Sequence, residues 1–281
     1  MPSVAFESTV FAHGLPSPLG LETALLLEEI AREKGADPRT IGIVSGRPIA
    51  GLSRDEIEHL ATSDSVRKAS LRDLPVVTAL GLDAATTVAG TVVIARQNGI
   101  EVVCTGGIGG VHRGPLPDIS NDLTVLARNP ITLVCSGAKA ILDLPATREH
   151  LESTGVTVVG YRTDEFPGFY SRSTGLPVDV RCENPDEVVE IVKARRRLGL
   201  TSATLVCVPV PEESAIPADQ LESIIADAID AAERSGVAGA RLTPYLLAAI
   251  VDATGGESLK ANIALLKNNA GVAAQIAVAI G

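Results

Sequence analysis

The stretch Glu101–Lys139, EVVCTGGIGGVHRGPLPDISNDLTVLARNPITLVCSGAK, decides the fold. It contains two short runs that are typical of buried β-strands, Glu101–Cys104 and Ile131–Cys135. The glycine-rich segment Thr105–Gly110 follows the first run, and Ser136–Lys139 follows the second. Open α/β sheets bind ligands beyond the carboxyl ends of their strands. We therefore expect a site where these two strands end.

The glycine-rich segment Thr105–Gly110 has four glycines in six positions. Such a segment can leave backbone N–H groups free for an anion, and His112 and Arg113 follow it as side chains able to meet a phosphate. The segment does not match the dinucleotide-binding fingerprint, because no helix of suitable period begins on it. It is not a Walker loop either, because no Gly-Lys-Ser/Thr follows. A flexible turn that binds nothing is the alternative.

Lys139 lies between two apolar segments, VCSGA before it and AILDL after it. We expect its stem to lie among apolar atoms, where burial lowers the pKa of a lysine and frees the amine as a nucleophile toward carbonyls. The alternative is a solvated charge, as for most surface lysines.

Glu7 lies in the middle of a predicted strand, Val4–Ala12. A carboxylate in an apolar strand is costly to bury unless it is paired or protonated. A buried Glu7 would have a raised pKa, which suits a general acid. The alternative is that Glu7 faces solvent on an edge strand.

The 281 residues can form one large α/β domain, and the absence of a linker or internal repeat predicts a single domain over residues 1–281. Hydrophobic residues make up 46% and aromatic residues 2%, so the core is expected to consist of Val, Ile, Leu and Ala. The net charge of −10 argues against a nucleic-acid or anionic-membrane surface. We find no secretory leader pattern and no run of 18 apolar residues, which predicts a cytoplasmic protein without a membrane partner.

Strand and helix patterns alternate along the chain, which predicts an α/β fold with a mostly parallel sheet. The capping box Ser53-x-x-Glu56 marks one helix start. Four of the seven aromatic residues lie in Tyr161–Arg172, which we expect to cover a pocket or a subunit contact. Further strands are predicted at 41–44, 156–159 and 204–208, and helices at 21–34, 53–60, 82–96, 147–153, 184–198, 217–235, 243–254 and 258–280.

Several longer motifs occur in order from one end of the chain to the other. They are ESTVFAHG (7–14), KASLRDL (68–74), ATTVAGT (85–91), TGGIGGVHRG (105–114), DISNDL (118–123), CSGAKAILD (135–143), TDEFPGFYSR (163–172) and NIALLKNNA (262–270). On these motifs the chain resembles the pseudouridine-5′-phosphate glycosidase family, which includes the indigoidine synthase A-like proteins. The resemblance implies a homotrimer with a three-layer α/β/α fold.

The resemblance also implies an activity, the reversible cleavage of the C–C glycosidic bond of pseudouridine 5′-phosphate to uracil and ribose 5-phosphate. By the match of motifs, Lys139 is the residue that forms a Schiff base with the ring-opened sugar, and Glu7 is the general acid and base. Asp118 matches the ligand of a divalent metal, usually Mn²⁺. One carboxylate with several waters suits such a hard cation.

The expected substrate contacts come from two sources. The resemblance assigns Ser120, Asn121 and Asp122, together with Lys68 and Val88. We expect Thr87, beside Val88, and also Lys68 and His112 to be phosphate or sugar contacts, His112 from chemistry alone. We place Asn262 near the uracil. The chain departs from the family pattern at Asn121, where alanine is common, in LPSPLG after Gly14, and at two positions of KASLRDL.

Other functions fit parts of the sequence. A class I aldolase-type lyase acting on a sugar phosphate would also use Lys139, but it would not consume uracil. A non-catalytic sugar-phosphate-binding protein would keep its affinity in Lys139→Ala and turn nothing over. A branch of the same family could act on a different C-nucleoside or in pigment biosynthesis.

Overall fold

The computed structural model describes residues 1–114, 118–237 and 242–281. The strands of its main sheet are β1 (Ser3–Glu7), β2 (Asp37–Val44), β3 (Arg47–Ala50), β4 (Arg67–Ala69), β5 (Ala84–Thr86), β6 (Val102–Cys104), β8 (Thr132–Cys135), β10 (Thr157–Tyr161), β11 (Val180–Cys182) and β12 (Thr204–Cys207). Their order is β11-β10-β12-β8-β6-β1-β2-β5-β4, and β3 pairs with β2. Only the pairs β2–β3 and β2–β5 of these described strands are antiparallel, which confirms the mostly parallel sheet.

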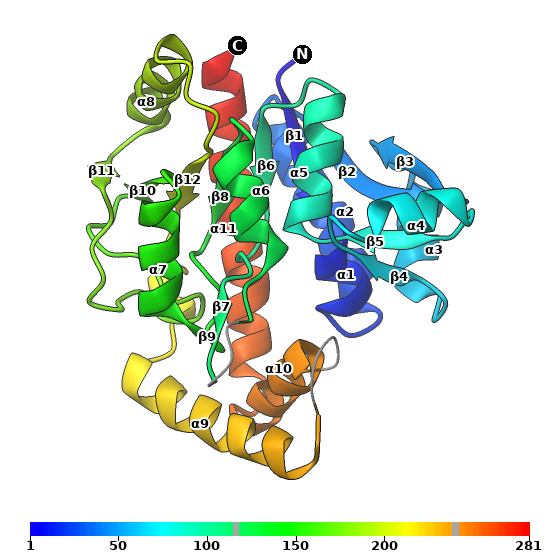
Figure 1. Cartoon of the computed structure of the whole chain (residues 1–281), viewed down its shortest axis with the longest axis vertical. Helices are drawn as coiled ribbons and strands as arrows, with labels where there is room; N and C mark the ends of the chain where they lie inside the picture. The colour runs from blue at the N-terminus through cyan, green and yellow to red at the C-terminus, as the bar shows by residue number, and fades with distance from the viewer. Residues whose placement is uncertain (115–117, 238–241) are drawn as a thin grey trace.

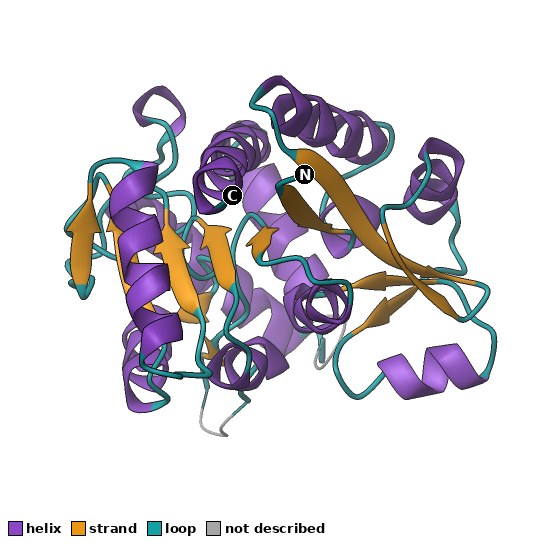
Figure 2. Cartoon of the chain, turned by 90° about the horizontal axis from the view of Figure 1, so that it is seen from above, coloured by secondary structure: helices purple, strands orange, loops and turns teal. Residues whose placement is uncertain are grey.

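Helices cover both faces of this sheet (Figures 1 and 2). One layer consists of α2 (Leu19–Glu33), α8 (Pro185–Arg197) and α11 (Glu257–Ile280), and the other of α5 (Val88–Gln97), α6 (Asn121–Arg128) and α7 (Leu144–Ser153). The predicted three-layer α/β/α architecture is therefore confirmed. The short strands β7 (Val111–His112) and β9 (Leu142–Asp143) form a separate antiparallel pair.

The remaining helices lie around these layers. They are α1 (Thr9–His13), α3 (Arg54–Thr62), α4 (Leu74–Ala79), α9 (Ala218–Arg234), α10 (Leu242–Ala253) and the 3₁₀ turn η1 (Glu212–Ser214). Helices α9 and α10 lie beyond the carboxyl ends of the central strands, at the bottom of Figure 1. The predicted capping box is present at α3, where Ser53 and Glu56 each bond the other's backbone N–H.

Helix α11 is the central helix of its layer. An 18-residue window of it has a mean hydropathy of 1.4, so its length and composition alone would allow it to cross a membrane. Half of that window is buried inside the protein, and the helix packs on β1, β6 and β8 as well as on α2 and α8. Its apolar surface is therefore explained by its place in the core.

The predicted strand Val4–Ala12 is wrong in its second half. Strand β1 ends at Glu7, and Thr9–His13 forms α1. The Ser8 carbonyl accepts the N–H groups of Phe11 and Ala12, so the chain turns into a helix as soon as its pairing with β2 and β6 ends. Glu7 is consequently at the carboxyl end of a central strand, and the edge-strand alternative is also wrong.

The predicted helix 82–96 begins too early. Ala84–Thr86 forms strand β5, and the helix α5 starts only at Val88. Strand β5 pairs with β2 on one side and β4 on the other, so tertiary pairing overrides the helical preference of the alanines.

Candidate active site

Glu7 is buried at the carboxyl end of β1, with 5% of its surface exposed. Thr105 is the residue that follows β6, and its hydroxyl donates a hydrogen bond to Glu7 Oε2. Burial raises the pKa of Glu7, although the charge of Lys139 and the Thr105 hydrogen bond act in the opposite direction. A carboxyl group with a raised pKa holds a proton more readily than an exposed one and can pass it on during a reaction.

Glu7 faces a cavity that Lys139 and Lys68 also line. Three strand ends thus contribute to one site, since Lys139 follows β8 and Lys68 belongs to β4. Asn262, from the first half of α11, lines the same cavity. The other lining residues are Thr9, Val10, His13, Gly14, Thr105, Gly106, Gly107, Phe169 and Leu247.

Two amines and one carboxyl group therefore share this cavity. Much of the Lys68 side chain is exposed, but the protein atoms around its amine lower its pKa, and the charge of Lys139 lowers it further. Glu7 and Asp122 act in the opposite direction on this pKa. Lys139 itself is half-buried. The cavity thus combines two amines with a buried carboxyl group, a set of groups that can handle a carbonyl compound carrying an anionic group.

The glycine-rich segment shapes this cavity by close packing. A Cβ atom on Gly107 would lie 2.6 Å from Phe169 Cδ2, and one on Gly109 would lie 2.3 Å from Ser120 Oγ. The Gly109 N–H is also bonded to Asp122 Oδ2 at 2.8 Å. The expectation that these amides are free for an anion is therefore wrong for Gly109, because a buried carboxylate of the protein already occupies its N–H.

Asp122 joins two helix starts near the cavity. Besides Gly109, it accepts a 2.9 Å bond from the Ala89 N–H in the first turn of α5. Ser120 is the N-cap of α6 and accepts a bond from the Asp122 N–H at 3.2 Å. Asn121 donates to Ser70 at 3.4 Å, beyond the end of β4. These three predicted residues hold the starts of α5 and α6 beside β4.

Thr87 is the N-cap residue of α5, and its neighbour Val88 is the first residue of the helix. The Thr87 hydroxyl is buried and has no hydrogen-bond partner among the described residues. A helix start with a free hydroxyl is suited to an anion. Neither Thr87 nor Val88 is among the residues that line the cavity around Glu7.

Asn269 connects α11 to both strand ends that carry the site. It donates to the Thr105 carbonyl at 2.9 Å and to the Gly106 carbonyl at 3.4 Å, and it accepts a bond from Ser136 Oγ at 3.2 Å. Asn262 and Asn269 lie seven residues apart on α11. Asn269 is fully buried, and without it the Ser136 hydroxyl and the Thr105 carbonyl would have no partner among the described residues.

Residues 1–279 match the sequence profile of a family described as "Indigoidine synthase A like protein". The chain belongs to the indigoidine synthase A-like family. Relatives of this family member include proteins named "Pseudouridine-5'-phosphate glycosidase" from Caldanaerobacter subterraneus subsp. tengcongensis and from Symbiobacterium thermophilum. Each is 53% identical to the chain, and the alignments cover 99% of it and 91% and 92% of the relatives.

Two solved structures of similar proteins have the same fold as this family member. An indigoidine synthase A-like protein from Thermotoga maritima is 43% identical, with a TM-score of 0.92 over 99% of this chain and 92% of that one. The prealnumycin C-glycosynthase AlnA, solved with ribulose 5-phosphate, is 38% identical, with a TM-score of 0.91 over 99% of this chain and 91% of that one. The resemblance to the family predicted from the sequence motifs is therefore confirmed.

Like Thr87 and Val88, the other predicted residues that do not line the cavity are Ser120, Asn121, Asp122, His112 and Asp118. His112 is half-buried on β7, and Asp118 is exposed, with its carbonyl accepting the His112 N–H at 2.9 Å. Within residues 1–114, 118–237 and 242–281, no three His, Cys, Asp or Glu side chains converge as a metal cage would require. The donor set at Asp118 is thus a single carboxylate, which fits a hard cation held mostly by water and ligand oxygens.

Sequence reasoning missed several residues of the cavity. His13 lines it with its Nε2 atom 3.1 Å from the Val66 carbonyl, and burial lowers the pKa of this histidine. Phe169, which lies in the predicted covering segment 161–172, also lines the cavity. Leu247 of α10 also lines the cavity, although it lies more than a hundred residues after Lys139 in the sequence. The motif ESTVFAHG contained the signal for His13, whereas no local pattern marks Leu247.

Proposed function

We propose that this enzyme reversibly cleaves the C–C glycosidic bond of pseudouridine 5′-phosphate to uracil and ribose 5-phosphate. The observation that carries the proposal is the placement of Glu7 and Lys139 on one cavity at the carboxyl ends of β1 and β8. The names of the two relatives at 53% identity support it. The ribulose 5-phosphate in the AlnA structure supports a sugar phosphate as ligand.

A Schiff base explains how such a bond can break. The C–C glycosidic bond has no leaving heteroatom to protonate, so a mechanism with two carboxylates fits it poorly. In the direction of synthesis, the Lys139 amine attacks the C1′ aldehyde of open-chain ribose 5-phosphate, and water leaves as the iminium forms. Carbon C5 of uracil then attacks C1′, and the electron pair of the iminium bond moves to nitrogen.

The remaining steps restore the uracil ring and release the lysine. The proton on C5 of uracil leaves, and the sugar O4′ hydroxyl displaces the Lys139 amine as the furanose closes. Cleavage follows the same steps in reverse. Glu7 gives the proton that water needs to leave and later accepts the proton from C5, roles that suit a carboxyl group whose pKa is raised by burial.

We assign different residues to the phosphate and to the uracil base of the substrate, which lie on opposite sides of the reacting carbon C1′. Lys68 and the start of α5 offer a cation and the free Thr87 hydroxyl to the phosphate, with Val88, Ser120, Asn121 and Asp122 beside them. Asn262 can hydrogen-bond the uracil. His112 stays a proposed phosphate or sugar contact.

A divalent cation, proposed as Mn²⁺, would bind at Asp118 through one carboxylate oxygen with water and ligand oxygens around it. When bound it would supply positive charge for the sugar phosphate. Excess chelator should then inactivate the enzyme, and Asp118→Ala should not regain activity with Mn²⁺. Full activity in excess chelator would remove the metal from the proposal. We also propose a cytoplasmic homotrimer, for which light scattering should give three chains per particle.

The direct test is the loss of uracil in the presence of ribose 5-phosphate, with and without Mn²⁺. The glycosidase consumes uracil, an aldolase-type lyase does not, and a sugar-phosphate-binding protein turns nothing over. The likeness to AlnA favours one second candidate, a C-glycosynthase that joins the sugar to another aromatic carbon. Turnover of ribose 5-phosphate with such an acceptor, but not with uracil, would support it.

A further inference from the structure

A second hollow lies between α2, α11 and the segments that follow β10 and β12. It has a volume of about 710 Å³ and shares no lining residue with the cavity around Glu7. We call it the α2–α11 groove. Its volume lies within the range of small-molecule sites. Its position beyond the carboxyl ends of two parallel strands is where open α/β sheets bind ligands.

The α2–α11 groove is rich in positive charge although the protein as a whole is acidic, with a net charge of −10. Its lining includes four cations, Lys34, Arg162, Arg172 and Lys267, against two carboxylates, Glu33 and Glu213. In the part of the chain that the structure describes, none of these four cations lies within 4.0 Å of a carboxylate. A concave surface that gathers uncompensated cations attracts anions.

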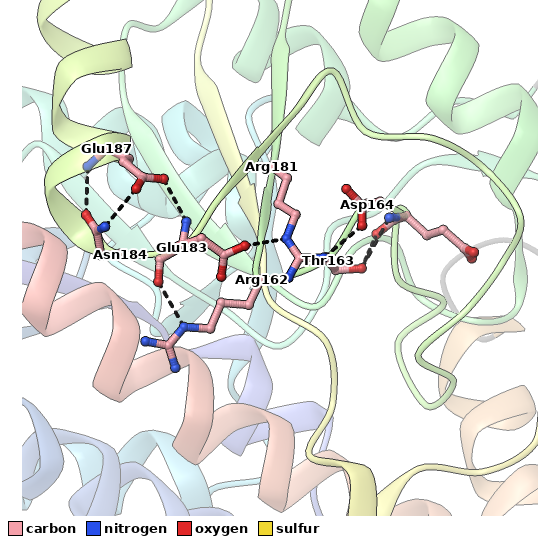
Figure 3. A network of polar contacts seen from close by, with 8 residues as sticks. Arg162, Thr163, Asp164, Arg181, Glu183, Asn184 and Glu187 are labelled. Carbon is pink, nitrogen blue, oxygen red and sulfur yellow. Dashed lines mark hydrogen bonds and ion pairs between the residues drawn. The ribbon is translucent and has the colours of Figure 1, made fainter.

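Both arginines of the α2–α11 groove are held in place by backbone carbonyls. Arg162 donates through Nε to the Glu183 carbonyl at 2.9 Å, and its guanidinium carbon lies 5.3 Å from the centre of the Tyr161 ring. Figure 3 shows its two terminal nitrogens turned away from the network around Arg181 and Glu183. Arg172 donates through Nη1 to the Val210 carbonyl at 2.5 Å. Each guanidinium is thus oriented but keeps N–H donors free of any described partner.

The backbone at Arg162 supports a functional reason for this arrangement. Its φ angle is 57°, in the left-handed region that a residue with a long side chain seldom adopts. Such a conformation is unfavourable for a residue with a Cβ atom and persists where the surrounding structure enforces it, often at ligand sites. Arg162 directly follows Tyr161, the last residue of β10. It adopts this conformation where the chain leaves the strand and lines the groove.

We propose that the α2–α11 groove binds a phosphorylated small molecule, with the phosphate held between Arg162 and Arg172. The planar guanidinium group matches phosphate oxygens with paired donors, and two of them fixed in advance lose little freedom on binding. Lys34 and Lys267 add charge, and Gln275 lines the groove as a neutral hydrogen-bonding side chain. This site is separate from the proposed active site and does not depend on the proposed function.

The test uses inorganic pyrophosphate as the probe, titrated by calorimetry at fixed ionic strength. The double variant R162Q/R172Q removes two positive charges from the groove. The matched control R54Q/R128Q removes two from exposed arginines that make no ion pair with a described residue and do not line the groove. We expect at least a tenfold weaker pyrophosphate affinity in R162Q/R172Q and less than a twofold change in R54Q/R128Q.

A second measurement locates the anion. Crystals of the wild-type protein soaked in sodium tungstate, a phosphate-shaped oxyanion, should show an anomalous peak between Arg162 and Arg172. If R162Q/R172Q does not fold, R162K/R172K replaces it, because lysine keeps the charge but lacks the paired donors. Equal affinity in the groove variant and the control, a tungstate peak only in the cavity around Glu7, or a neighbouring subunit filling the groove would each overturn the proposal.

Discussion

Replacing Asn269 by alanine should destabilise the protein and disturb the active site together. Asn269→Ala leaves the Ser136 hydroxyl and the Thr105 carbonyl buried without partners, whereas the Gly106 carbonyl still accepts the Ser136 N–H at 2.7 Å. Each orphaned buried group costs about 1–3 kcal/mol, so we expect a loss of about 3 kcal/mol in the free energy of unfolding. The entropy of unfolding is about 2.1 cal/mol/K per residue, so for 281 residues this loss lowers the melting temperature by about 5 °C.

The neighbouring residue provides a matched control. Asn268 is half-buried and donates one bond, to the Pro209 carbonyl at 3.2 Å, so Asn268→Ala should cost no more than about 1 kcal/mol. Thermal unfolding followed by circular dichroism measures both variants. Because Thr105 holds Glu7, the uracil-dependent rate should also fall more in Asn269→Ala than in Asn268→Ala, well below either melting temperature. Equal melting temperatures in the two variants would refute this account of Asn269.

Three further predictions concern the site. Burial raises the pKa of Glu7 above its ordinary value of 4.5, so the folded protein binds this proton more tightly than the unfolded chain and loses stability as the pH rises from 4.5 through the raised pKa. Glu7→Gln should therefore melt above the wild type at neutral pH, with a difference that shrinks below pH 4.5, and a constant difference across this range would contradict the assignment. Asp122→Asn should cost about 1–3 kcal/mol in urea unfolding, because asparagine can accept only one of the two backbone N–H groups that the carboxylate now binds. Gly107→Ala should displace Phe169 and reduce the rate. Gly271→Ala, in the interior of α11, would place its Cβ at an ordinary contact distance of 3.9 Å from Ile30 Cγ2, so it should leave the rate unchanged and stabilise the helix by about 0.5–1 kcal/mol. Equal rates in the two variants would contradict the close packing of Gly107 on Phe169.

The sequence predicts those parts of the fold that local patterns encode. The strands ending at Cys104 and Cys135 and the capping box at Ser53 are where the apolar runs and the cap residues place them. Strand β5 was not predicted, because its three residues are held by pairing with β2 and β4, which other segments of the chain separate from it. An alanine- and threonine-rich run has no local property that reveals such partners.

The residues of the candidate site also differ in whether the sequence could predict them. Glu7, Lys68, Lys139 and Asn262 were predicted separately, and the structure brings them onto one cavity. The burial of Asn269 could not be predicted, because its partners Thr105 and Ser136 follow two different strands and meet it only when α11 packs on the sheet. Asp122 likewise shows its role only when α5 and the glycine-rich segment lie beside it.

The central claim is that Lys139 forms a covalent bond to the sugar. The most direct measurement is borohydride reduction of the protein with ribose 5-phosphate, followed by peptide mass spectrometry, with Lys68→Gln and Lys139→Ala treated in parallel. We predict a reduced sugar-phosphate adduct on Lys139 in the wild type and none in Lys139→Ala. An adduct on Lys68 instead, or full turnover of uracil by Lys139→Ala, would contradict the account.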